Sequence, residues 1–140
     1  MRVGWILAAT LAVGPVAPAE GVLAGPVAAE VVAVVDGDTL DVRARVWLGQ
    51  QVSVRVRIDG IDAPELRGRC TAERTAATAA RAELSRRTLG RLVQLWDVRW
   101  DKYGGRVLAR VTDAEGDVAQ QALADGWVRA YEGGARAAWC

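Results

Sequence analysis

The sequence predicts a mainly β domain with two helices, folded as a five-stranded Greek-key barrel of the OB type. Three β-branched segments come first, an alanine-rich helical segment follows, and two more short strands and a short helix complete the chain. A helix placed after the third of five strands fits such a barrel. The 140 residues are enough for one domain of this size, and an open α+β sheet is the alternative arrangement.

The first three strands are expected at residues 30–35, 39–47 and 51–58. The first is a β-branched run that ends at an Asp-Gly-Asp turn, and a second turn separates the other two. In the third strand, valine or isoleucine stands at every even position from 52 to 58, with polar side chains such as Arg57 between them. Such alternation is typical of a strand with one buried face. These segments therefore predict a meander.

The alanine-rich run at 72–89 predicts the longer helix. Pro64 ends the strand region before it, because the residue before a proline favours extended geometry. Thr71 is a suitable N-cap, and Gly90 stands where a left-handed residue often closes a helix.

The second half of the chain predicts two more strands and one more helix. The strands are expected at 92–98 and 106–111. Asp117 and Gln120 suit a capping box, which opens a short helix that Gly126 ends.

The N-terminus has the pattern of a secretory signal peptide. Arg2 is the only charge before Glu20, an apolar run follows it, and Ala-Pro-Ala at 17–19 fits a cleavage site. A membrane anchor is the alternative, but prolines interrupt the run before the ~20 apolar residues that a span needs. We therefore expect a signal peptide at 1–19, a leader at 20–29 and one domain at 30–140. The mature chain is expected to be a monomer without a membrane anchor, periplasmic or extracellular.

Export also affects the interpretation of Cys70 and Cys140, the two cysteines of the chain. In an oxidising compartment a disulfide between them is expected, and two unpaired buried thiols are the alternative. The bridge would bring the end of the chain back to the segment that follows Glu65.

The composition excludes several mechanisms. Histidine is absent and serine occurs twice, which rules out Ser-His-Asp and Cys-His catalysis and histidine-ligated zinc sites. Acid–base chemistry must come from carboxylates, Tyr, Lys or Cys, so we expect a pH profile without an inflection near pH 6.5. Every basic residue except Lys102 is arginine, which favours bidentate contacts to phosphate. The net charge of +1 means that any nucleic-acid binding depends on locally gathered arginines.

Three short segments carry most of the functional information. They are Asp-Gly-Asp-Thr at 36–39, Arg57 followed by Asp-Ala-Pro-Glu at 62–65, and Asp-Lys-Tyr-Gly-Gly-Arg at 101–106. Taken singly, each has an ordinary explanation as a turn or a surface ion-pair cluster. Taken together, their carboxylates suit a hard divalent cation and their guanidiniums suit a phosphate. This combination indicates metal-assisted cleavage of a phosphodiester.

In order and spacing, the three segments resemble the motifs of the staphylococcal nuclease-like (thermonuclease) family, from about residue 31 to residue 131. The resemblance implies an OB barrel and a Ca²⁺-dependent nuclease acting on DNA or RNA, with single strands or frayed ends favoured. It implies carboxylate ligands to Ca²⁺ from Asp38 and Asp62, and a carbonyl ligand from Ala63. The family usually has one glycine before the arginine of the third motif, whereas this chain has Gly104 and Gly105.

The resemblance also implies roles for six other residues. Glu65 would act as general base or orient the attacking water, and two guanidiniums would clamp the phosphate: Arg57 and Arg106. Three side chains would lie along the nucleotide: Lys102, Tyr103 and Tyr131. Trp47, Trp96 and Trp100 are expected to be structural.

Two other functions fit the same residues. One is a non-catalytic OB module that binds single-stranded nucleic acid or oligosaccharide, which would not need Glu65 beside the two aspartates. The other is a disulfide-stapled, Ca²⁺-dependent adhesion or scaffold module, which would have no affinity for nucleic acid.

Overall fold

A computed structural model describes residues 11–14 and 21–140 of the chain. The signal peptide expected at 1–19 lies outside the described residues except for 11–14. Within the described ranges, no helix has the length and apolar character that crossing a membrane requires.

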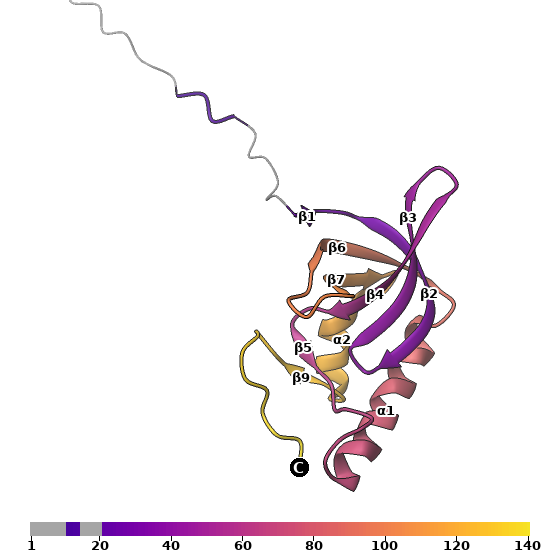
Figure 1. Ribbon diagram of the computed structural model, residues 1–140, viewed down its shortest axis with the longest axis vertical. Helices are drawn as coiled ribbons and strands as arrows, with labels where there is room; N and C mark the ends of the chain where they lie inside the picture. The colour runs from indigo at the N-terminus through magenta and orange to yellow at the C-terminus, as the bar shows by residue number, and fades with distance from the viewer. Residues whose placement is uncertain (1–10, 15–20) are drawn as a thin grey trace, which may run out of the picture.

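A closed five-stranded barrel forms the body of the molecule, as predicted (Figure 1). Its strands are β2 (Val27–Asp36), β3 (Thr39–Trp47), β4 (Gln50–Ile58), β6 (Leu92–Trp100) and β7 (Val107–Asp113). β2, β3 and β4 form the predicted antiparallel meander, β7 joins β4 in parallel, and β6 pairs with both β7 and β2 to close the barrel. This mixed, closed order agrees with an OB-type barrel.

Four short strands lie outside this barrel order. β1 (Val22–Leu23) pairs with β6, β8 (Gly116–Asp117) pairs with β7, and β5 (Ile61–Asp62) pairs with β9 (Arg129–Ala130). β1 and the start of β2 fall in the segment that the sequence suggested as a leader, so the ordered sheet begins earlier than expected. Ala29 explains the difference, because it is fully buried and pairs with both β3 and β6.

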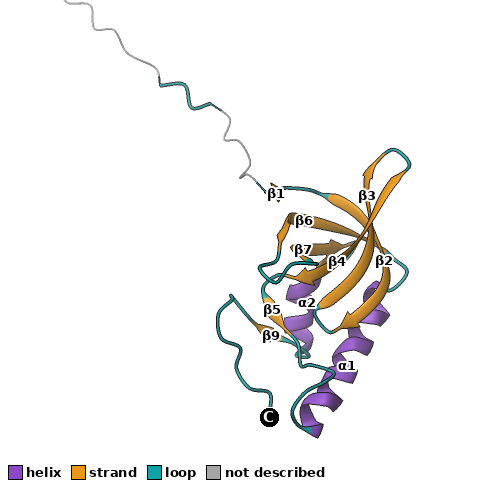
Figure 2. Cartoon of the chain, viewed as in Figure 1, coloured by secondary structure: helices purple, strands orange, loops and turns teal. Residues whose placement is uncertain are grey.

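Two helices cover one side of the barrel, α1 (Thr71–Thr88) and α2 (Val118–Asp125) (Figure 2). Asp117 caps α2 through a hydrogen bond from the Gln120 backbone N–H, and Gly126 ends it in the left-handed conformation. The N-cap of α1 is Cys70 and not Thr71 as expected, because Cys70 has the extended backbone of a cap. Its sulfur accepts a weak hydrogen bond from the Glu73 N–H at 3.4 Å.

Cys70 and Cys140 form the expected disulfide, with their Cα atoms 6.0 Å apart. The bond links positions separated by 70 residues. In the chain-entropy description, a loop of that length stabilises the folded state by about 4 kcal/mol. The disulfide also anchors the C-terminal tail next to the start of α1, as Figure 1 shows for the yellow end of the ribbon.

Candidate cation and phosphate site

The guanidinium of Arg57, near the end of β4, lies at the centre of the candidate site. The Arg57 side chain is only 10% exposed. Its Nη1 donates to the carbonyl oxygens of Ile58 and Ile61 at 2.9 and 2.7 Å. Its Nη2 lies 3.3 Å from Asp38 Oδ2 and 3.7 Å from Asp62 Oδ1. The two aspartates predicted as metal ligands therefore meet at one fixed guanidinium.

The Asp-Gly-Asp-Thr turn holds the Asp38 carboxylate in place. Its Oδ1 accepts a hydrogen bond from the Thr39 hydroxyl, and its Oδ2 accepts one from the Ala63 backbone N–H, both at 2.8 Å. The glycine of this turn is required by close packing, because a β-carbon at Gly37 would lie 2.7 Å from that of Ala80 in α1 and 2.9 Å from that of Ala63. Helix α1 thus supports the turn from behind.

Burial changes the acidity of Asp38. Loss of solvent raises the pKa of Asp38 from 3.8 to about 6, and its interaction with Asp36 acts in the same direction. The positive charge of Arg57 opposes this shift only in part. The absence of an inflection near pH 6.5 in activity stays a prediction, which assumed carboxyl groups of ordinary pKa.

Asp62 is the most deeply buried carboxylate of the site, with 1% of the residue exposed. Its Oδ2 accepts hydrogen bonds from Arg129, at 3.3 Å from Nε and 3.2 Å from Nη2, and from Trp139 Nε1 at 3.2 Å. Within the described part of the chain, its Oδ1 accepts no hydrogen bond, although guanidiniums lie near it. The negative charge on this buried oxygen is balanced by ion pairs with Arg57 and Arg136.

Arg136 in the C-terminal tail joins the acidic residues of the second motif. It forms ion pairs with Asp62 Oδ1 and Glu65 Oε1, and its Nη2 donates to the Ala63 carbonyl oxygen at 3.3 Å. Burial by itself would lower the pKa of Arg136, but the bonds to Asp62 and Glu65 outweigh it and raise the pKa. The sequence did not predict this contact, although the expected disulfide already placed the chain end near the motif.

Arg106 follows the turn between β6 and β7. Its Nε pairs with the carboxylate of Asp101, which is 8% exposed, and its guanidinium lies 5.7 Å from the ring centroid of Tyr103. Burial favours a raised pKa for Asp101, but the hydrogen bond and positive charge of Arg106, together with backbone hydrogen bonds from Tyr103 and Lys102, outweigh it and lower the pKa. The turn accommodates both glycines at 104 and 105 in the left-handed conformation.

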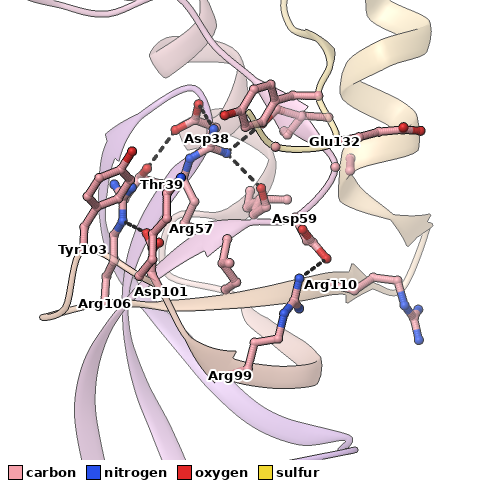
Figure 3. A pocket seen from close by; sticks show the side chains of 18 of the residues that line it. Asp38, Thr39, Arg57, Asp59, Arg99, Asp101, Tyr103, Arg106, Arg110 and Glu132 are labelled. Carbon is pink, nitrogen blue, oxygen red and sulfur yellow. Dashed lines mark hydrogen bonds and ion pairs between the residues drawn. The ribbon is translucent and has the colours of Figure 1, made fainter. Parts of the chain in front are cut away.

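The three motifs line one open cavity of about 1000 Å³ (Figure 3). The lining contains seven of the residues predicted for the site: Asp38, Arg57, Glu65, Lys102, Tyr103, Arg106 and Tyr131. The Tyr131 hydroxyl donates to the Gly134 carbonyl at 2.6 Å, so it is engaged within the tail. Trp100 also lines the cavity and is 72% exposed, which contradicts its expected place in the core. Trp47 is exposed as well, at the tip of the β3–β4 hairpin.

Oxygen atoms are the donors that this site offers to a metal. In the described ranges, no three His, Cys, Asp or Glu side chains are arranged to hold a metal ion together. The available donors are the carboxylates of Asp38 and Asp62 and the carbonyl of Ala63, with Glu65 held beside them by Arg136. Oxygen donors of this kind suit Ca²⁺ or Mg²⁺, with the remaining positions left to water and substrate.

No protein-family model matches the chain, and comparison with curated proteins finds no significant match. The resemblance in the three motifs and the geometry of the cavity are therefore what a functional proposal rests on.

Proposed function

We propose that this protein is a cation-dependent phosphodiesterase that hydrolyses DNA, RNA or both, as the motif resemblance implies. One observation carries the proposal: three motifs from separate parts of the chain line a single cavity, with the buried carboxylates of Asp38 and Asp62 beside Arg57 and that of Asp101 beside Arg106. A surface ion-pair cluster does not need such burial, because exposed pairs form without it.

The donor set fits Ca²⁺ as the cation. Asp38 and Asp62 would hold it through carboxylate oxygens and Ala63 through its carbonyl, and a cation on Asp62 Oδ1 would take the place of the Arg136 guanidinium that pairs with this oxygen. Bound Ca²⁺ would supply positive charge that polarises a phosphoryl oxygen.

The two arginines would bind the phosphate. Two backbone carbonyls fix the Nη1 of Arg57, so its orientation is set before substrate arrives. Arg106 pairs with Asp101 and is 31% exposed, so its guanidinium can reach a ligand in the cavity. Donors fixed in this way stabilise the additional negative charge of the transition state, and the loss of one costs ~10²–10³ in rate.

Glu65 is the candidate general base, because its carboxylate lines the cavity and is 53% exposed. It would accept a proton from the attacking water, or orient that water toward the phosphorus. Glu65 pairs with Arg136, so catalysis would require Glu65 to exchange this partner for water.

The rim of the cavity suits single-stranded substrates. Tyr103 and Trp100 are both more than 70% exposed and stand beside Lys102 in the lining. Exposed aromatic rings beside positive charges bind successive bases by stacking with little sequence preference. We therefore propose single strands or frayed ends as the favoured substrate.

We further propose that the protein acts outside the cytoplasm. A disulfide is typical of exported proteins, and the N-terminal pattern is that of a signal peptide. An extracellular or periplasmic enzyme can use a weak Ca²⁺ site, since such sites bind at ~10⁻⁴–10⁻³ M.

The proposal is tested by incubating the purified protein with single-stranded DNA or RNA, in Ca²⁺ or in EDTA. We expect cleavage in Ca²⁺, loss of cleavage in EDTA, and a loss of about 100-fold or more in Glu65→Gln. Glu132→Gln is the matched control, because Glu132 lines the same cavity and is exposed, and no role is assigned to it.

The alternatives predict different outcomes. A binding module would retain single-stranded DNA in a mobility-shift assay without cutting it, and Glu65→Gln would not change the binding. An adhesion or scaffold module would bind Ca²⁺ but neither bind nor cut nucleic acid.

A further inference from the structure

Arg136 contacts each of the groups proposed to ligate the cation or activate water in the second motif. It pairs with the carboxylates of Asp62 and Glu65 and donates to the carbonyl of Ala63. One of these atoms, Asp62 Oδ1, is buried, and ion pairs with Arg136 and Arg57 balance its charge. The positively charged guanidinium of Arg136 therefore contacts the oxygen atoms that are proposed to bind the metal.

The tail that carries Arg136 is held at the site by several contacts. Its end is bonded to Cys70 through Cys140, and Trp139 donates from Nε1 to Asp62 Oδ2 at 3.2 Å. The guanidinium of Arg129 lies 3.9 Å from the ring centroid of Trp139. The yellow C-terminal segment in Figure 1 accordingly passes back alongside β5 and β9. These contacts keep the guanidinium of Arg136 near the acidic residues.

We propose that Arg136 is an internal competitor of Ca²⁺, which neutralises Asp62 and Glu65 in the metal-free protein and thereby sets the affinity for the cation. This inference rests on the proposed function, because it takes the same carboxylates as the metal site. Arg136 is a positioning residue in this account, since it acts through the carboxylates and has no assigned contact with substrate.

Competition follows from the charges at the site. Asp62 faces three guanidiniums, those of Arg57, Arg129 and Arg136. Arg57 and Arg129 also bond to backbone carbonyls, at Ile58 and Ile61 for the former and at residues 137 and 138 for the latter.

Arg136 is the most exposed of the three arginines, since the side chains of Arg129 and Arg57 are 30% and 10% exposed, and the one carbonyl it bonds to is that of Ala63, itself a proposed ligand. Its side chain is 39% exposed, so the guanidinium can turn into solvent while the disulfide still holds the tail. When it leaves, it frees Asp62 Oδ1 and the Glu65 carboxylate together. Ca²⁺ binding must displace this guanidinium, which weakens the apparent affinity by the fraction of molecules in the competent state.

The test measures Ca²⁺ binding directly, by isothermal titration of CaCl₂ into the metal-stripped full chain. We expect Arg136→Gln to bind Ca²⁺ about tenfold more tightly than wild type. Arg110→Gln is the matched control: Arg110 lines the same cavity, is exposed, and stacks on Trp96 away from the acidic residues. It removes the same charge and should bind like wild type.

A second experiment detects Ca²⁺ binding through the stability of the protein, in place of the heat of binding. The rise of the urea midpoint on addition of Ca²⁺ should be larger in Arg136→Gln than in wild type or Arg110→Gln, because a ligand stabilises in proportion to its affinity. Far-UV circular dichroism checks that each variant is folded.

The outcomes separate the two proposals. Equal Ca²⁺ affinity in Arg136→Gln and wild type, with both binding, overturns the inference and leaves the proposed function standing. If Arg110→Gln gains as much as Arg136→Gln, the effect is one of general charge and the inference is also overturned. If neither the wild type nor Arg136→Gln binds Ca²⁺, the metal site and the inference fall together.

Discussion

Replacing Asp38 by Asn is expected to stabilise the metal-free protein at pH 7.5, although it removes a carboxylate from the centre of the site. Asp38 is 4% exposed and must be ionised at that pH, next to the carboxylate of Asp36. Asn can accept from the Ala63 N–H and donate to the Thr39 hydroxyl, so both hydrogen bonds of the carboxylate have a replacement. The substitution therefore removes a buried charge without leaving polar groups unpaired.

The magnitude follows from the pKa. Burial raises the pKa of Asp38 from 3.8 to about 6, a difference that corresponds to about 3 kcal/mol. The pKa of Asp38 is 3.8 in the unfolded chain and about 6 in the folded protein. Protonation of Asp38 therefore stabilises the folded protein fully below pH 3.8, and this stabilisation is lost as the pH rises through about 6. We expect Asp38→Asn and wild type to be similar in stability near pH 4, and the variant to be more stable by about 2–3 kcal/mol at pH 7.5.

The assay is urea unfolding in EDTA at the two pH values, followed by tryptophan fluorescence. Asp101→Asn is an informative control, because the pKa of Asp101 is lowered and its ionised form is stabilised by the bond from Arg106. Removing the charge of Asp101 should therefore destabilise the protein at pH 7.5. The reasoning is refuted if Asp38→Asn is less stable than wild type at pH 7.5, with a difference that does not change between the two pH values.

Two further predictions concern how the fold supports the site. Gly37→Ala should lower the free energy of unfolding by about 1–3 kcal/mol, because the added β-carbon would collide with those of Ala63 and Ala80. An unchanged midpoint in urea unfolding would contradict this packing. Asp113→Asn should lower stability at pH 7, because Arg87 donates to Asp113 at 2.7 and 3.0 Å and this bond lowers the pKa of the carboxyl. The ionised Asp113 carboxylate stabilises the folded protein above pH 3.8, and this stabilisation is lost as the pH falls through the lower pKa of the folded state. If the stability difference between Asp113→Asn and wild type is as large at about pH 2 as at pH 7, this explanation is wrong.

Much of the fold could be predicted from the sequence because its signals are local. The alternation from residue 52 to 58 placed β4 to within a residue, and the glycines at 90 and 126 marked the ends of both helices. The expected five-strand order led to the observed barrel. The segment before residue 30 was harder, since its small residues and Pro26 resemble a linker, and its strands depend on pairing with the distant β6 and with β3.

The residues of the site could be predicted from the sequence, but their protonation and ion pairing could not. The three motifs indicated which side chains gather, and all but the buried Asp62 and Ala63 line the cavity. The raised pKa of Asp38 depends on its burial in the tertiary structure, which no local pattern encodes. Arg136 lies in a tail without regular periodicity, so its place follows only from the disulfide and the contacts of Trp139.

A crystal structure of the protein grown with Ca²⁺ and a short deoxyribonucleotide tests the central claim most directly. We predict the cation on Asp38 and Asp62, a phosphate within hydrogen-bonding distance of Arg57 and Arg106, and the guanidinium of Arg136 moved away from Asp62. A nucleotide bound at another face of the barrel, or a cation with no ligand from Asp38 or Asp62, would contradict it.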